Sequence, residues 1–175
     1  MMEEKGLPKR KYPRLKNYDY SQGGAYFITI CTHDRKRILS EIKMSESNSV
    51  GWGLAPTATV CLTKWGEIIE GELQKITSRY PFVEIENYII MPNHIHLILT
   101  INRESVGASP HPTVMDIVCA FKSLSTKTCR KGGYEGVLFQ RSFYDRIIRS
   151  RDEYMEICNY VVLNPENWET DELYN

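Results

Sequence analysis

Two histidines, His94 and His96, lie two residues apart in the run HIHLILTI, which is otherwise apolar except for Thr100. On a β-strand these side chains share one face and lie about 7 Å apart. Two imidazoles at this spacing can reach one divalent metal ion, although a third oxygen or nitrogen ligand is then needed. The pair uses two of only four histidines in the chain. The spacing predicts a metal site, with a purely structural histidine pair as the alternative.

Tyr160 and Asn164 form a second candidate pair, in the run NYVVLNPENW. On a helix, Tyr160 lies beside the apolar stripe rather than on it, and Asn164 follows one turn later. A phenol can attack a phosphodiester if a nearby metal ion offsets the phosphate charge. The Asn164 amide oxygen can bind the same ion. One helix would then carry both a nucleophile and a third ligand, while an ordinary surface tyrosine is the alternative.

The elements that must position these residues follow from hydrophobic periodicity and turn residues. A buried strand is predicted over 25–33, and a helix begins at Thr63 and ends before Pro81. Two antiparallel strands flank the break at Pro92-Asn93. A basic amphipathic helix covers 113–130, a last strand covers 138–149, and a final helix runs from about Ser150 to Asn164. The sequence does not determine the structure of residues 38–62.

This order of elements predicts an α+β fold with a ferredoxin-like, split βαβ antiparallel sheet. The helices are expected mainly on one face, with an appended C-terminal helix that carries Tyr160. The prediction is one domain over residues 1–175. Within it, residues 1–24 form a basic N-terminal arm, and residues 150–175 form the tyrosine helix and an acidic tail.

The charges cancel over the whole chain but not along it. The sequence has 175 residues, with 22 basic and 22 acidic residues and therefore a formal net charge of zero. The net charge is +5 over residues 1–37, −4 over 38–119, +6 over 120–151 and −7 over 152–175. A zero sum argues against a nucleic-acid partner, whereas the two basic blocks leave room for one.

Composition excludes several classes of protein. Hydrophobic content of 42% and charged content of 25% are ordinary for a globular domain. The five cysteines are scattered without a CxxC pair, which favours reduced thiols over a disulfide framework. No apolar run is long enough to span a membrane, so we expect a cytoplasmic protein without a membrane partner.

The run NYIIMPNHIHLILTI resembles the HUH motif (His, hydrophobic, His) of single-tyrosine transposases. NYVVLNPENW resembles the tyrosine helix of the REP-associated tyrosine transposase group of that superfamily. Three further runs are similar and extend the resemblance over most of the chain: RLKNYDYSQGGAYFITICT, AFKSLSTK and FQRSFYDRIIRSRDEY.

The resemblance implies roles for four residues. His94 and His96 bind a catalytic divalent ion, Mg²⁺ or Mn²⁺, and Tyr160 is the nucleophile. Asn164 occupies the position of the third ligand, with Glu153 or Glu156 as alternatives because hard cations prefer carboxylate oxygens. The implied reaction is transposase-like nicking and rejoining of single-stranded or hairpin DNA through a 5′-phosphotyrosine.

The resemblance also implies partners and surfaces. Basic residues expected to follow DNA phosphates are Lys9, Arg10, Lys11, Arg14, Lys122, Lys127, Arg141 and Arg146. We expect the basic blocks beside the histidine face, and the acidic tail largely away from the DNA path except where Tyr160 enters it. The resemblance allows a homodimer as well as a monomer, because relatives in the superfamily form dimers.

Two other functions are weighed against this one. The first is a non-catalytic, domesticated protein that binds DNA hairpins with the same fold. The second is an unrelated metallohydrolase, which ranks last because the apolar residues Leu97 and Ile98 stand where such a site would place further ligands.

Overall fold

The computed structural model describes residues 20, 23–45, 57–102 and 112–174. Its centre is a 4-stranded antiparallel sheet in the order β4-β5-β1-β6. The strands are β1 (Gly24–Cys31), β4 (Val83–Ile90), β5 (His94–Ile101) and β6 (Tyr144–Ile148). In chain order, α1 (Lys64–Arg79) lies between β1 and β4, and α2 (Val114–Lys131) lies between β5 and β6. The α+β, split βαβ prediction is therefore confirmed.

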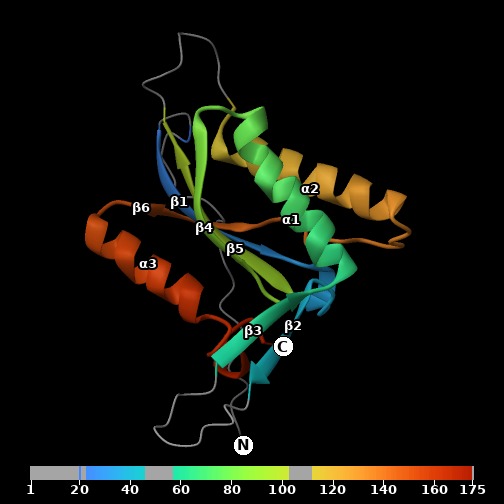
Figure 1. Ribbon diagram of the computed structural model, residues 1–175. Coiled ribbons are helices and arrows are strands. Elements are labelled where there is room, and N and C mark those ends of the chain that lie inside the picture. Colours follow the sequence, from blue (N-terminus) through green and yellow to red (C-terminus); the bar gives the residue numbers. More distant parts are fainter. Residues whose placement is uncertain (1–19, 21–22, 46–56, 103–111, 175) are drawn as a thin grey trace, which may run out of the picture.

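The helices cover both faces of this sheet (Figure 1). Helices α1 and α2 lie together on one face, and α3 (Arg151–Leu163) lies alone on the other. On the α1/α2 face, strand β5 contributes the alternating buried residues Ile95, Leu97, Leu99 and Ile101 to the larger core. On the α3 face, Ile98 packs with Ile157 and Val161 in a smaller cluster. Alternate side chains of β5 therefore face different cores, because successive side chains of a strand point to opposite faces of the sheet.

The helix starts are fixed by hydroxyl caps. Thr63 accepts hydrogen bonds from Trp65 N and Gly66 N at the start of α1. Thr113 forms a capping box with Asp116 at α2, and Ser150 accepts from Glu153 N at α3. Such caps satisfy amide groups that have no partner within the helix. The third cap sets where α3 begins and hence where Tyr160 lies.

The segment that the sequence left undetermined forms a second, 2-stranded antiparallel sheet. Its strands are β2 (Ser40–Ser45) and β3 (Thr57–Leu62). The Ser40 hydroxyl donates to the Ile90 carbonyl, which ties β2 to the end of β4. A Cβ atom on Gly66 would collide with the Leu39 carbonyl oxygen, so glycine is what lets α1 pack against the start of β2.

The last strand is shorter than predicted, because only Tyr144–Ile148 pairs with β1. The preceding residues run alongside the end of β1, where Phe139 forms an isolated bridge with Thr32. The carbonyls of Gln140 and Arg141 accept hydrogen bonds from the Lys122 ammonium instead of from a neighbouring strand. The predicted strand start at residue 138 is therefore wrong.

Candidate active site

The two histidines lie on the α3 face of β5, side by side and buried. His94 is 0% exposed and His96 is 3% exposed, and their ring centroids are 4.5 Å apart. The neighbouring strand β1 pairs Thr29 with His96, so the Thr29 side chain lies on the same face. The predicted sharing of one face is confirmed.

Each ring is held through its Nδ1 atom. His94 Nδ1 lies 2.7 Å from Asn93 Oδ1, an oxygen that can only accept, so His94 Nδ1 carries the proton. His96 Nδ1 lies 2.9 Å from the Thr29 hydroxyl. His94 Nε2 is buried and has no hydrogen-bond partner among the described residues. This arrangement leaves a lone pair on His94 Nε2 for a ligand, in the manner of metal-binding histidines.

Both histidines are held neutral. Burial lowers the pKa of His94 to about 3, with the Arg35 charge acting in the same direction and Asn164 acting against them. Burial, with the charge of His94, lowers the pKa of His96 well below its usual value, and Asp171 opposes that shift. Neutral imidazole is the form that binds metal ions.

Asn164 lies at the C-cap of α3, where Pro165 ends the helix. Its side chain is 2% exposed, and its Nδ2 donates to Asp171 Oδ2 at 2.8 Å. Its Oδ1 is buried without a hydrogen-bond partner in the described part of the chain. A buried amide oxygen without a donor is costly, which makes it a natural ligand for a cation.

Tyr160 lies over the same face from α3. Its hydroxyl is 3.4 Å from His96 Nε2 and 3.3 Å from Asp171 Oδ2. The ring packs edge-on against Phe27, and the side chain is 45% exposed. Burial and the adjacent Asp171 carboxylate raise the pKa of Tyr160 to about 12. The phenol is therefore protonated near neutral pH, and its oxygen lies between a histidine and a carboxylate.

Asp171 is the site residue that the sequence analysis missed. Ligand atoms of His94, His96 and Asp171 all lie within 4.8 Å of one another, and this is the one such group of histidine, cysteine and acidic side chains among the described residues. Asp171 follows the short 3-10 helix η2 (Trp168–Thr170). No spacing in the sequence marks it, because its approach depends on the path of the chain after Pro165.

The segment after η2 is fastened to the loop that follows β1. The Arg37 guanidinium lies 4.3 Å from the Tyr174 ring centroid and 5.4 Å from that of Trp168, and it donates to the Tyr174 carbonyl at 2.6 Å. Asn93 Nδ2 donates to the Leu173 carbonyl at 2.6 Å. Asn93 therefore links the C-terminal segment to His94, the ring that it also orients.

The alternative ligands on α3 lie outside this cluster. Glu153 is paired with Arg146 at 2.7 Å and accepts from Arg149 N at 2.9 Å, near the start of the helix. Glu156 is exposed and is not in the group of metal-binding side chains. Of the proposed third ligands, the fold brings only Asn164 beside the histidines.

The predicted DNA-contacting residues divide into three sets. Lys9, Arg10, Lys11 and Arg14 lie outside the described residues. Lys122 is bonded to backbone carbonyls, and Arg146 is paired with Glu153. Lys127 and Arg141 are exposed and line a pocket beside α2.

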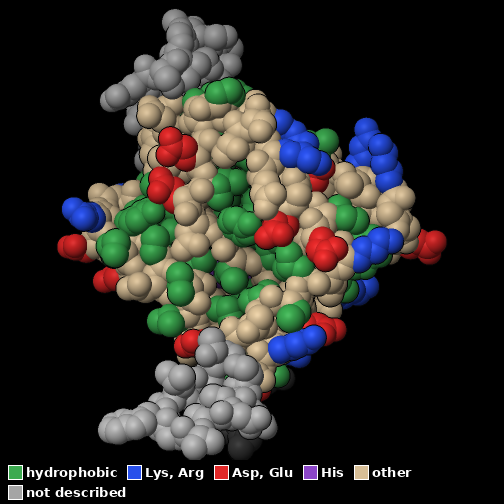
Figure 2. All heavy atoms as spheres, in the orientation of Figure 1, with side chains coloured by type: hydrophobic (Ala, Val, Ile, Leu, Met, Phe, Trp, Pro, Cys, Tyr) green, Lys and Arg blue, Asp and Glu red, His purple; other side chains and the backbone are tan. Residues whose placement is uncertain are grey.

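The predicted position of the second basic block beside the histidine face is wrong for helix α2. Helix α2, which carries much of the +6 block, packs on the face opposite the histidines, because its apolar stripe joins the larger core. The acidic tail reaches the site that Tyr160 also enters, because it brings Asp171 to the histidines. No histidine side chain is visible on the face in Figure 2, in keeping with the burial of the pair.

The donor atoms of this site suit a divalent metal ion. His94 Nε2 and Asn164 Oδ1 are both buried acceptors without partners in the described part of the chain. His96 and Asp171 add a nitrogen and a carboxylate. Mixed nitrogen and oxygen ligands of this kind can bind a divalent metal ion.

The fold is shared with a solved transposase structure. The structure is similar to that of a REP-associated tyrosine transposase bound to a REP hairpin, with a TM-score of 0.60 and 19% identity over 88% of this chain and 73% of that chain. The fold is therefore that of the REP-associated tyrosine transposases, as the sequence resemblance predicts.

The chain belongs to the same family as a Haemophilus influenzae protein that bears the name "Uncharacterized protein". The two are 30% identical over 184 residues, covering 97% of this chain and 95% of the relative. No family model matches the sequence. Within the described residues, no helix is both long and apolar enough to cross a membrane.

Proposed function

We propose that this protein is a metal-dependent enzyme that nicks and rejoins single-stranded or hairpin DNA through Tyr160. The observation that carries the proposal is the distance of 3.4 Å between the Tyr160 hydroxyl and His96 Nε2. A candidate nucleophile and a candidate metal ligand thus come together within one chain. The similar structure was solved with a REP hairpin, which supports DNA of this kind as the substrate.

The residues that would hold the ion are His94, His96 and Asn164, with Asp171 beside them. When bound, a divalent ion supplies positive charge that stabilises the negative charge developing on the phosphate and on the leaving oxygen. Neutral imidazoles and the unpartnered Asn164 oxygen keep these donor atoms available without a prior proton loss. Mg²⁺ and Mn²⁺ are the ions proposed.

The chemical step is a transesterification. The Tyr160 oxygen forms a bond to phosphorus as the bond from phosphorus to the 3′ oxygen breaks. The products are a 5′-phosphotyrosine and a free 3′-hydroxyl, which takes its proton from water. One phosphate ester replaces another, so no nucleotide cofactor is consumed. Attack by a 3′-hydroxyl on the phosphotyrosine reverses the step and rejoins DNA.

The phenol proton needs an acceptor, because the pKa of Tyr160 is raised to about 12. The Asp171 Oδ2 atom, 3.3 Å from the phenol oxygen, is placed to take this proton as the bond to phosphorus forms. Asn164 Nδ2 donates to the same Oδ2 atom and so keeps the carboxylate turned toward Tyr160. We therefore assign Asp171 the role of general base.

The basic arm extends the proposed DNA contact. Lys9, Arg10, Lys11 and Arg14 are proposed to follow phosphates, a role that charge alone supports. The site needs no residue from a second chain, since Tyr160 and both histidines belong to one chain. A homodimer is therefore not required for the chemistry that we propose.

The test is a covalent adduct on a denaturing gel after the protein is mixed with hairpin DNA and Mn²⁺. We expect an adduct with the wild type and none with Tyr160→Phe or with EDTA. Tyr154→Phe, on the same helix but bonded to Glu86, is the matched control and should retain the adduct. Salt-sensitive hairpin binding without any adduct would instead favour a non-catalytic DNA-binding protein.

A further inference from the structure

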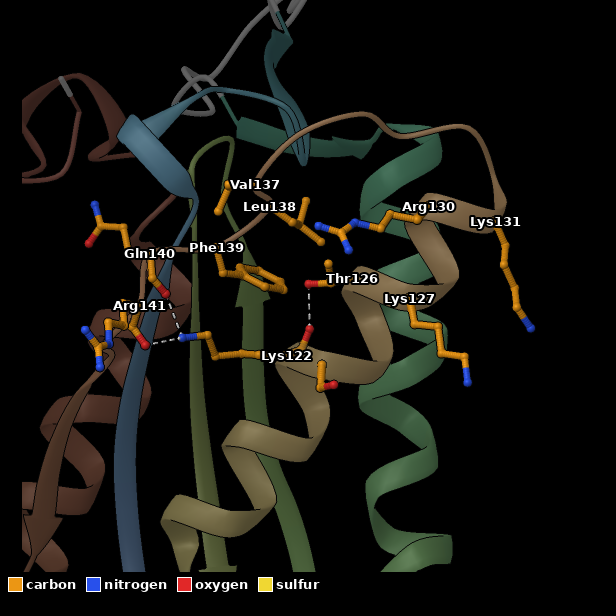
Figure 3. A pocket seen from close by; sticks show the side chains of 11 residues that line it. Lys122, Thr126, Lys127, Arg130, Lys131, Val137, Leu138, Phe139, Gln140 and Arg141 are labelled. Carbon is orange, nitrogen blue, oxygen red and sulfur yellow. Dashed lines mark hydrogen bonds between the residues drawn. The ribbon is translucent and has the colours of Figure 1, made fainter.

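A basic pocket lies away from the histidine site, between the C-terminal half of α2 and residues 137–141 (Figure 3). Its volume is about 710 Å³, and none of its lining residues belongs to the His94/His96 cluster. Helix α2 packs on the sheet face opposite α3, so this pocket and Tyr160 lie on different sides of the sheet. Figure 2 likewise shows Lys and Arg side chains mainly on the side where α1 and α2 lie.

The lining is rich in cations and contains no acidic residue. Five of its 11 residues are Lys or Arg: Lys122, Lys127, Arg130, Lys131 and Arg141. The last four form no ion pair with any part of the chain that the structure describes. Cations gathered without counter-charges repel one another, so an anionic ligand would stabilise this arrangement.

Lys122 is the exception, because its ammonium is used by the protein itself. Its Nζ donates to the carbonyls of Gln140 at 2.7 Å and Arg141 at 3.0 Å, and burial lowers its pKa. These bonds hold residues 140 and 141 against α2, as Figure 3 shows. Lys122 is thus a positioning residue that builds one wall of the pocket rather than a phosphate contact.

The remaining cations are arranged around the opening. In Figure 3, Arg130 extends across the pocket toward Leu138, whereas Lys127 and Lys131 project outward from α2 and Arg141 projects from the other wall. Arginine binds phosphate through two parallel N–H bonds, and lysine adds a flexible charge. The pocket therefore carries cations on both of its walls.

The lining favours paired over unpaired DNA as a ligand. Proteins that hold single strands stack bases on exposed aromatic rings. The aromatic residue of this lining, Phe139, is only 6% exposed and packs with Phe121. Phosphate contacts without stacking suit a duplex, whose bases are already stacked on one another.

We propose that this pocket binds the phosphate backbone of the duplex stem of a DNA hairpin, through Arg130 and Arg141 with Lys127 and Lys131 at the rim. The proposal rests on the proposed function, in which the protein acts on such DNA. The stem and the scissile strand would then contact opposite sides of the sheet, so the junction between them has to pass around an edge of the protein.

The test compares hairpin DNA with an unpaired oligonucleotide of equal length, by fluorescence anisotropy in EDTA so that no cleavage occurs. For Arg130→Ala/Arg141→Ala we expect hairpin affinity to fall about tenfold or more at 0.1 M salt. The slope of log affinity against log salt should fall by about two, one for each lost phosphate contact. Affinity for the unpaired oligonucleotide should not change.

The matched control is Arg149→Ala/Arg151→Ala, which removes two exposed arginines at the start of α3 and should leave hairpin affinity unchanged. An equal loss in this control would overturn the proposal, because net charge would then explain the effect. An equal loss for both oligonucleotides, or no loss at all, would also overturn it. The readout is binding, so a failure of covalent chemistry at Tyr160 is seen separately in the adduct assay.

Discussion

The phenol oxygen of Tyr160 and the Oδ2 atom of Asp171 lie 3.3 Å apart, although the end of α3 and all of η2 separate the two residues in the chain. Asn164 Nδ2 donates to the same Oδ2 atom. The carboxylate therefore lies where the nucleophile, the amide and the histidine pair meet.

Asp171→Asn should slow formation of the covalent adduct about 100-fold, because the amide keeps the shape of the side chain but cannot take the phenol proton. Adduct is measured over time with hairpin DNA and Mn²⁺. The neighbouring Glu172→Gln, which lies outside the metal-binding cluster, is the control for loss of one negative charge. An adduct rate in Asp171→Asn equal to that of the wild type would rule out the general-base role.

Asn164→Ala should weaken Mn²⁺ binding at least about tenfold, since it removes the buried, unpartnered Oδ1 atom. Isothermal titration of the protein with Mn²⁺ in the absence of DNA measures this change. Asn159→Ala, an exposed asparagine on the same helix, should bind Mn²⁺ as the wild type does. Unchanged affinity in Asn164→Ala would leave the histidines without this third ligand.

Arg37→Ala should reduce adduct formation by about tenfold or less, because it removes the cation–π contacts and the hydrogen bond that hold the segment carrying Asp171. These interactions are each worth about 1 kcal/mol. Arg37→Lys should restore part of the rate, and the exposed Lys36→Ala should have no effect. Faster adduct formation in Arg37→Ala would mean that the C-terminal segment obstructs the site instead.

Gly66→Ala should destabilise the protein, by about 1–3 kcal/mol, because the added Cβ meets the Leu39 carbonyl oxygen and pushes α1 away from the start of β2. Gly71→Ala is the matched control in the same helix, where the added Cβ meets nothing within 4 Å. The control should gain up to about 1 kcal/mol from helix propensity. Urea unfolding of both variants measures the difference, and equal midpoints would contradict this packing.

Glu72 should stabilise the protein at neutral pH, and this stabilisation should be lost in acid. Burial raises the pKa of Glu72, but the hydrogen bonds and charges of Lys75 and Arg79 outweigh it, and the net shift is downward. A lowered pKa gives stability that is present above the unfolded-state value near 4.5 and lost as pH falls through the folded-state pKa.

Glu72→Gln should therefore cost about 1–3 kcal/mol at pH 7 and less at pH 3, where the pH lies below the unfolded-state value. Urea midpoints at the two pH values test this prediction. The exposed Glu67→Gln, five residues earlier in α1, should show no such difference between pH 7 and pH 3. A constant cost at both pH values would mean that Glu72 contributes through packing rather than charge.

Much of the fold could be predicted from local patterns. Alternation in the run from His94 to Ile101 set both its strand structure and the shared face of the histidines. Hydroxyl caps and proline stops set the helices, since these signals act within a few residues. The length of β6 was overestimated because the residues before it have an extended pattern in the sequence. In the structure, the carbonyls of Gln140 and Arg141 accept hydrogen bonds from Lys122.

The sequence by itself determined the residue types of the site: two histidines on one strand face, and a tyrosine with an amide one turn later on a helix. Only the tertiary structure decided that Asp171 joins them, that β2 pairs with β3, and that α2 lies on the opposite face. The physical reason is range. Caps and periodicity act between near neighbours, whereas the approach of Asp171 to His94 depends on packing between segments distant in the chain, which leaves no spacing to read.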